Sequence, residues 1–197
     1  NELVTTLEYQ VAEIYLSQKR YRDALASYVR VLRREGEASD VAHFRIGEIK
    51  LLMNKPDEAA EYFRDLLNRF PNSRMRSDAR YKLARSLEAF GDYKQAFTEY
   101  RSFLMENPGH PLVGRAWYQA GICANRLKDE KSALQFFEKV LQHKVSPELI
   151  VRSRYELGRL EKMRGNFELA MNHIQVAISS GILPELGGIL QFELGDL

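Results

Sequence analysis

Apolar residues recur along this chain at three- and four-residue intervals, the spacing that places them on one face of an α-helix. Short polar breaks interrupt the pattern, and no segment alternates with the two-residue period of a β-strand. The pattern predicts helices in pairs. We expect the first helix of each pair, helix A, at about 3–18, 38–53, 74–90, 111–127 and 147–163. We expect the second, helix B, at about 21–35, 56–69, 93–106, 130–143 and 167–180.

The residues between the paired helices are typical helix breakers. Asn54, Gly91 and Gly165 suit the left-handed conformation that closes a helix. Asp92, Asp129 and Asn166 then stand where a side chain can cap helix B, and Pro56 suits a first helical position.

The helix pairs are copies of one motif. An alanine recurs in helix B at spacings of 35, 37, 37 and 37 residues, as Ala24, Ala59, Ala96, Ala133 and Ala170. A fixed period in this range is typical of stacked-repeat proteins, in which each unit leaves an apolar face for its neighbour to cover. Such proteins bind other molecules more often than they transform them. The sequence therefore predicts an all-α solenoid.

The aligned columns resemble the tetratricopeptide repeat (TPR). In that family, small residues at places 8 and 20 let the paired helices cross closely. Place 20 is the alanine column, and place 8 is Ala12, Gly47, Ala84, Gly121 and Gly158. Place 24, a large apolar residue, is Tyr28, Phe63, Tyr100, Phe137 and Ile174. The resemblance implies a right-handed superhelical α-solenoid of stacked helix-turn-helix repeats.

We divide the chain, as a single TPR array over residues 1–197, into repeats at about 3–37, 38–72, 73–109, 110–146 and 147–183. Residues 185–197 resemble the first helix of a sixth repeat, so we interpret the chain as a fragment of a longer array. The extra residues between repeats, with Pro111 and Pro147, predict that helix A begins about a turn early in repeats three to five.

Lengthened repeats with a tyrosine in helix A are similar to those of bacterial envelope proteins. Examples are the repeat lipoprotein of the outer-membrane protein assembly machine and the periplasmic Tol-Pal coordinator. The similarity implies a periplasmic or outer-membrane-associated protein rather than a cytoplasmic one.

In the TPR family, helices A line the concave face of the superhelix. Place 5 of helix A is aromatic in every repeat, as Tyr9, Phe44, Tyr81, Tyr118 and Tyr155, with Phe192 as a sixth. One interpretation is a row of flat surfaces for an extended peptide. The other is that the rings pack in the interior, as aromatic residues at helical spacing commonly do.

The charges at places 2, 9 and 12 of helix A change along the chain. Repeats one to three are mostly acidic there, apart from Arg85, whereas repeats four and five carry Arg115, Arg152, Arg159 and Lys162, with Asn125. Such a gradient would direct an acidic segment of a partner toward repeats four and five. The alternative is a solvated face without consequence for binding. No repeat has the lysine and asparagine clamp with which co-chaperone TPR domains hold a terminal carboxylate.

Composition and missing motifs exclude several classes of function. The net charge of +2 is too small for nucleic-acid binding, and no apolar run approaches the roughly 18 residues of a membrane span. The histidines and the single cysteine, Cys123, lack the spacing of a zinc site. No glycine-rich phosphate loop occurs. We therefore expect no cofactor, no metal and no catalytic residue.

Two functional hypotheses remain for the chain itself. The first is a protein-interaction scaffold that holds a peptide or partner subunit on its concave face. The second is a module of a polysaccharide export or modification system, with tyrosines and arginines facing sugar rings and carboxylates. A third possibility, an arm of an enzyme, requires a catalytic domain outside these residues.

Overall fold

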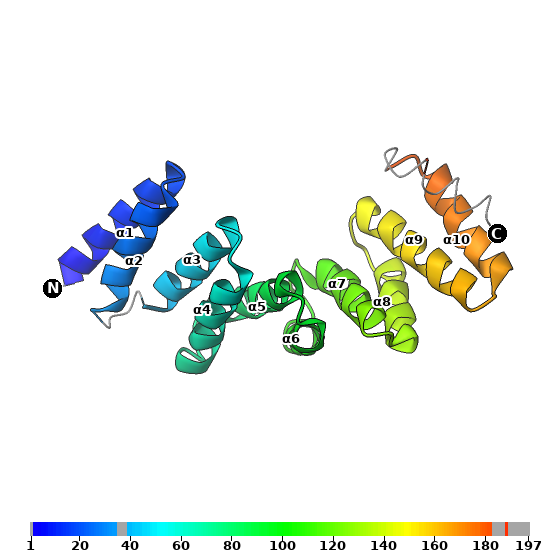
Figure 1. The fold of residues 1–197 in the computed structure, drawn as a ribbon, viewed down its shortest axis with the longest axis horizontal. Coiled ribbons are helices and arrows are strands. Elements are labelled where there is room, and N and C mark those ends of the chain that lie inside the picture. Colours follow the sequence, from blue (N-terminus) through cyan, green and yellow to red (C-terminus); the bar gives the residue numbers. More distant parts are fainter. Residues whose placement is uncertain (1, 35–38, 183–187, 189–197) are drawn as a thin grey trace. The chain divides into compact units, whose positions relative to one another are not determined.

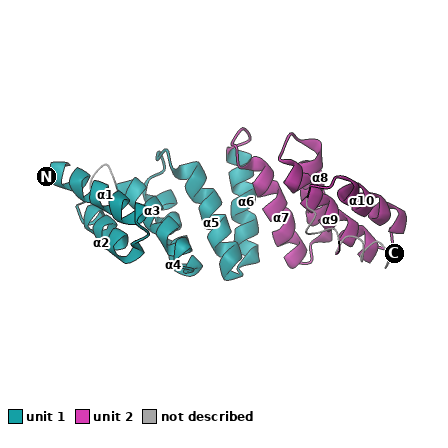
Figure 2. Cartoon of the chain, turned by 90° about the horizontal axis from the view of Figure 1, so that it is seen from above, with its two compact units in different colours: residues 1–106 teal, residues 107–197 magenta. Residues whose placement is uncertain are grey.

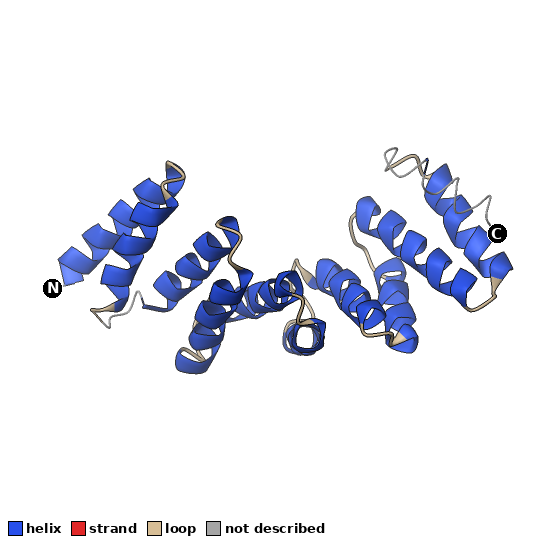
Figure 3. Cartoon of the chain, viewed as in Figure 1, coloured by secondary structure: helices blue, strands red, loops and turns tan. Residues whose placement is uncertain are grey.

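The computed structural model describes residues 2–34, 39–182 and 188, and these residues form helices, turns and no strand (Figure 3). Successive helices pair as antiparallel hairpins (Figure 1). The A helices are α1 (Glu2–Ser17), α3 (Ser39–Leu52), α5 (Arg76–Phe90), α7 (Val113–Arg126) and α9 (Pro147–Met163). The B helices are α2 (Tyr21–Leu32), α4 (Pro56–Arg69), α6 (Tyr93–Glu106), α8 (Glu130–Gln142) and α10 (Phe167–Ser179). The predicted all-α helix-turn-helix fold is confirmed.

The breaker residues act largely as predicted. Asn54, Gly91 and Gly165 have positive φ angles of 57°, 95° and 78°. The Asp92 carboxylate accepts a hydrogen bond from the Gln95 backbone N–H at 3.0 Å, and Asp129 caps α8 in the same way. Asn166 makes no such capping bond.

The predicted early start of helix A is confirmed only in the fifth repeat, where α9 begins at Pro147. It is wrong for α5 and α7, because residues 74–75 and 111–112 form turns. Hydrogen bonds of the three-residue turn type precede both helices, from Arg76 N to Ser73 O and from Val113 N to His110 O. Pro111 therefore lies in a turn rather than at a first helical position.

The small residues at place 8 are required by direct contact with place 24. A Cβ atom on Gly47 would lie 2.7 Å from the Phe63 ring, and one on Gly121 would lie 2.6 Å from the Phe137 ring. Real Cβ contacts are never this short. The two helices of a hairpin therefore cross at a distance that only a glycine tolerates in these repeats.

Three of the A helices are also covered by the preceding helix B: α2 covers α3, α4 covers α5 and α8 covers α9. The residues at places 3, 7 and 10 of α3 are consequently fully buried: Ala42, Ile46 and Ile49. The same places of α1 are 49%, 39% and 55% exposed: Leu7, Val11 and Ile14. This difference measures how much of the burial of helix A comes from the helix B before it.

The chain forms two compact units, residues 1–106 with α1–α6 and residues 107–197 with α7–α10 (Figure 2). The division into a single array with the repeat boundaries given above stays a prediction. The predicted sixth-repeat helix at 185–197, with Phe192, lies outside the described residues apart from position 188.

Candidate functional site

The aromatic rings at place 5 pack against place 24 within their own hairpins. The ring centroids are 5.7 Å apart for Tyr9 and Tyr28, and the rings meet at 73°. The equivalent pairs have separations of 5.7, 5.9 and 5.8 Å: Phe44–Phe63, Tyr81–Tyr100 and Tyr118–Phe137. Such pairs contribute roughly 0.5–1.5 kcal/mol beyond their buried area. The aromatic column is therefore, first of all, part of the hairpin core.

The exposure of these rings differs from repeat to repeat. Phe44 and Tyr81 are only 7% and 4% exposed, and rings of the following helix B pack against both. They contribute packing rather than flat contact surfaces. Tyr9, Tyr118 and Tyr155 are half-buried and keep part of the side chain in solvent. The five rings thus do not form an open row.

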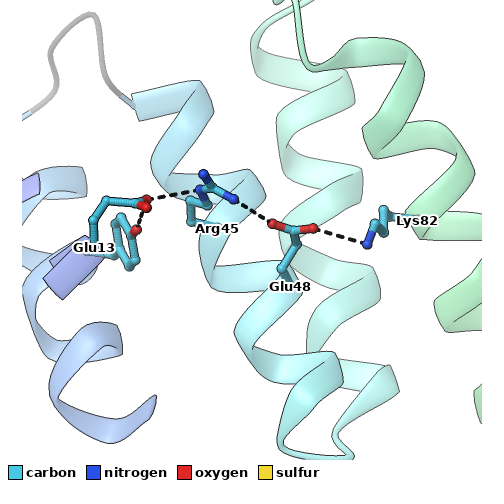
Figure 4. A network of polar contacts seen from close by, with 5 residues as sticks. Glu13, Arg45, Glu48 and Lys82 are labelled. Carbon is cyan, nitrogen blue, oxygen red and sulfur yellow. Dashed lines mark hydrogen bonds and ion pairs between the residues drawn. The ribbon is translucent and has the colours of Figure 1, made fainter. Parts of the chain in front are cut away.

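The acidic residues of repeats one and two are paired with cations of the next repeat (Figure 4). The Glu13 carboxylate of α1 lies 3.0 Å from Nε of Arg45 in α3. Glu48 of α3 bridges Nη1 of Arg45 and Nζ of Lys82 in α5, at 3.0 Å each. A carboxylate at place 9 therefore meets a cation at place 6 of the following repeat. The predicted acidic half of the surface is largely neutralised.

Hydrogen bonds tie this chain of charges to the core. The Tyr28 hydroxyl donates to the Glu13 carboxylate, and burial together with Glu13 raises the pKa of Tyr28. Partial burial alone would lower the pKa of Arg45. A hydrogen bond to Tyr9 and the carboxylates of Glu13 and Glu48 outweigh that effect and raise it. Arg45 thus stays charged at every physiological pH.

The third repeat breaks this pattern, because place 9 is Arg85. Its side chain is exposed, and within the described residues no carboxylate lies at ion-pair distance from it. A hydrogen bond with Tyr81 helps to raise the pKa of Arg85 against the opposing effect of partial burial. The nearby carboxylate of Glu88 accepts a hydrogen bond from the Tyr100 hydroxyl at 2.7 Å. Arg85 is thus a cation that interacts electrostatically with Glu88 but forms no ion pair among the described residues.

An open groove of about 560 Å³ lies beside Arg85, within the first compact unit. The carboxyl ends of α1 and α3 form part of it, together with the middle of α5 and the turn before α2. Its apolar lining consists of leucines and tyrosines: Leu16, Leu51, Leu52, Tyr21 and Tyr81. Its polar lining is Ser17, Lys19, Glu48, Lys82 and Arg85. A groove with this lining can take a ligand that is both apolar and anionic.

Two of the basic residues predicted in the second compact unit, Arg152 and Arg159, have partners on their own helix. Nε of Arg152 lies 3.0 Å from Glu148, and Nη1 of Arg159 lies 3.6 Å from Glu156, all within α9. Burial raises the pKa of Glu156 although Arg159 and Arg126 oppose this. Arg115 is exposed, and Asn125 is half-buried. This surface is less basic than the sequence suggested.

The repeat geometry agrees with a comparison to protein families. The family model of YfiO, described as an outer membrane lipoprotein, matches residues 36–161, which is more than half of the chain. The chain belongs to the YfiO family. No curated protein matches this chain.

Solved structures with the same fold are TPR proteins. MamA has a TM-score of 0.79 at 16% identity, over 91% of this chain and 92% of MamA. A TPR protein from Parabacteroides merdae has a TM-score of 0.79 at 23% identity, over 97% of this chain and 73% of its own. YrrB, described as a TPR protein with an unusual peptide-binding site, has a TM-score of 0.77 at 20% identity, over 96% of this chain and 91% of YrrB. At these identities the likeness establishes the TPR fold.

Sequence reasoning missed most of the groove in this YfiO-family chain. Lys19, Tyr21 and Leu52 lie at or beyond the end of helix A, outside the four places that the TPR resemblance pointed to. Lys82 stands at place 6, a position to which the TPR resemblance gives a binding role only in the carboxylate clamp of co-chaperones. The sequence did contain one signal for the groove. Helix A of repeats one and two ends with the leucines Leu16, Leu51 and Leu52, and a helix end that faces only solvent does not need such residues.

Two further properties hold for the described part of the chain. It has no group of three or more His, Cys, Asp or Glu side chains that could hold a metal ion. None of its helices combines the length and the apolar character needed to cross a membrane.

Proposed function

We propose that this chain is a protein-interaction scaffold that holds a peptide segment or a partner subunit on its helix-A face, within a larger bacterial envelope assembly. The observation that carries the proposal is the groove beside α1, α3 and α5. In it the exposed Leu52 and the half-buried Leu16 and Leu51 lie together with Lys19 and Arg85, two cations that form no ion pair within the described part of the chain. An exposed apolar surface rimmed by polar residues is typical of an interaction site.

The rest of the hairpins supports this proposal by fixing the groove. The edge-on ring pairs hold the two helices of each hairpin together. The charges from Glu13 to Lys82 link three successive A helices. A surface that is fixed before binding loses less conformational entropy when a partner docks.

The family supports a place for the scaffold in the cell envelope. YfiO is described as an outer membrane lipoprotein, and a further protein with this fold, PilW, is described as a type IV pilus biogenesis factor. We accordingly propose a periplasmic or outer-membrane-associated protein. Among the residues predicted to contact the partner, we retain those with exposed or half-exposed side chains: Tyr9, Arg85, Arg115, Tyr118, Asn125, Arg152, Tyr155 and Arg159.

The polysaccharide hypothesis loses support from the same geometry. It needs a row of open rings on which sugars stack, and Phe44 and Tyr81 are buried. The arginines that were to meet sugar carboxylates in α9, Arg152 and Arg159, already lie beside carboxylates of their own helix. We therefore propose a protein or peptide as the partner.

The test is selection of binders from a random peptide library displayed on phage, with the purified chain as bait. Individual clones are then measured against a double variant of the groove, Leu52→Glu with Arg85→Glu. A matched double variant outside the groove lining, Met105→Glu with Arg74→Glu, serves as control. All four positions are exposed, so neither variant disturbs the core. We expect binding that the groove variant abolishes and the control preserves. Clones that bind both variants equally, or no clones at all, would contradict the proposal.

A further inference from the structure

We infer that the groove beside α1, α3 and α5 takes a peptide segment in which a side-chain carboxylate stands next to a large apolar side chain. This inference rests on the proposed function and names the chemistry of its ligand. Two features of the lining carry it, the excess of cations and the position of the leucines.

The cations of the groove outnumber its carboxylates. Lys19, Lys82 and Arg85 line it, and Glu48 is the only carboxylate among the lining residues. Glu48 already holds Lys82 at 3.0 Å and Arg45 at 3.0 Å. Lys19 and Arg85 are therefore left without an ion pair inside the described part of the chain. An anionic ligand group supplies the missing partner with hydrogen bonds between charged groups, which are stronger than neutral ones.

Arg85 is the better placed of the two free cations. Its guanidinium interacts with the Tyr81 side chain, and the Tyr81 ring is itself fixed against Tyr100 and Phe103, with centroids 5.9 and 5.6 Å away. The guanidinium is thus supported by a buried ring and still exposed. A planar fork held in this way suits a carboxylate, which it can bind through two parallel hydrogen bonds.

The leucines specify what stands beside that carboxylate. Leu52 is 60% exposed, and Leu16 and Leu51 are half-buried. A large apolar side chain of the ligand would cover this surface and release the water from it. An inorganic anion or a nucleic-acid backbone would satisfy the cations but leave the leucines in water. The combination fits an acidic, apolar segment of a protein.

Glu48 sets the direction in which such a segment lies. Its carboxylate already binds Arg45 and Lys82, so a second carboxylate placed on that side of the groove would find both cations engaged. The ligand carboxylate is therefore directed to Arg85 and Lys19.

The experiment uses the clones selected above, resynthesised as fluorescent peptides with amidated carboxyl ends, so that only side chains supply carboxylates. Fluorescence anisotropy gives the affinity for the wild type, for Arg85→Gln and for Arg74→Gln as control. We expect the groove-dependent clones to share an Asp or Glu beside Leu, Phe, Tyr or Met. Replacing that acid by its amide should weaken binding about tenfold, and Arg85→Gln should do the same. When the two changes are combined, their effects on the dissociation constant should not multiply, because both changes remove the same contact.

The outcomes separate this inference from the proposed function. Clones that lose binding in the groove double variant but contain no acidic residue would overturn the carboxylate, while the scaffold proposal stands. The same holds if the acid and Arg85 act independently in the double-mutant cycle. Clones that ignore the groove double variant, or an empty selection, would overturn both.

Discussion

Glu13 in α1 and Arg45 in α3 form an ion pair of 3.0 Å across two successive repeats. The pair is the first link of a chain of charges that continues through Glu48 to Lys82 in α5. The sequence suggested that Glu13 and Glu48 belong to an acidic binding surface, but in the structure their ion pairs connect successive A helices. Glu48 and Lys82 also line the groove, and at Arg85, the next position in the series, the chain of ion pairs ends.

The chain of charges makes a measurable prediction. Arg45→Met removes both ion pairs of Arg45, and we expect the free energy of unfolding to fall by about 1 kcal/mol, since the residues are only partly exposed and act as a network. The loss should shrink at high salt, which screens partly exposed charges. Urea denaturation at low and high salt measures both effects. Lys55→Met is the control, because the ion pair of Lys55 among the described residues is the local one with Glu58, three positions along the chain. Its effect should be close to zero. Equal losses for the two variants would contradict the account.

The close crossing of paired helices predicts a cost for one added methyl group. Gly47→Ala brings a Cβ atom to 2.7 Å from the Phe63 ring, and the ring has no room to move within the core. We expect a loss of about 1–3 kcal/mol, as is typical of overpacking. Gly109→Ala is the matched control, because a Cβ atom there has no neighbour within 4 Å. Thermal unfolding followed by circular dichroism distinguishes them, and an unchanged midpoint for Gly47→Ala would refute the contact.

Helix α4 covers α5, whereas α1 has no preceding helix among the described residues. The same substitution, leucine to alanine, should therefore affect stability differently in α5 and in α1. Leu83→Ala removes a side chain that is 2% exposed in α5, and should lower stability by about 2–5 kcal/mol. Leu7→Ala removes one that is 49% exposed in α1, and should lower it by less than about 1 kcal/mol. Urea midpoints give the comparison. Equal losses would mean that α1 is covered in solution by something that the described residues do not include.

His173 predicts a dependence of stability on pH. Burial, and then the positive charge of Arg154, lower the pKa of its imidazole. The folded protein therefore binds a proton less readily than the unfolded chain, whose histidine has a pKa of about 6.5. Stability is retained above that pH and decreases as the pH falls below it, because protonation favours the unfolded chain. Unfolding measured between neutral and mildly acidic pH should show a smaller decrease in His173→Gln. Identical pH profiles for the two proteins would rule out this contribution.

The fold was accessible from the sequence because the relevant signals are local. The alanine column, the small residues at place 8 and the breakers such as Gly91 each act within one hairpin. Helices α5 and α7 begin at Arg76 and Val113, two residues later than predicted, because short turns replace the extra helical turn that was expected there.

The site was less accessible because its residues are brought together across repeats. The pattern cannot tell whether a ring such as Phe44 faces solvent or the following helix B. Nor does it show that Glu48 meets Lys82, because the pairing links place 9 of one repeat with place 6 of the next. The groove itself arises where the ends of α1 and α3 approach α5, and no single segment encodes that meeting.

The most direct test of the central claim is a methyl NMR titration of the leucine-labelled chain with a library-selected peptide. Leu16, Leu51 and Leu52 line the groove, whereas Leu127 and Leu169 are exposed elsewhere. We predict that the methyl signals of the first three shift together and saturate at one peptide concentration, and that those of Leu127 and Leu169 stay in place. Shifts confined to Leu127 or Leu169, with the groove leucines unchanged, would show that the partner binds another surface.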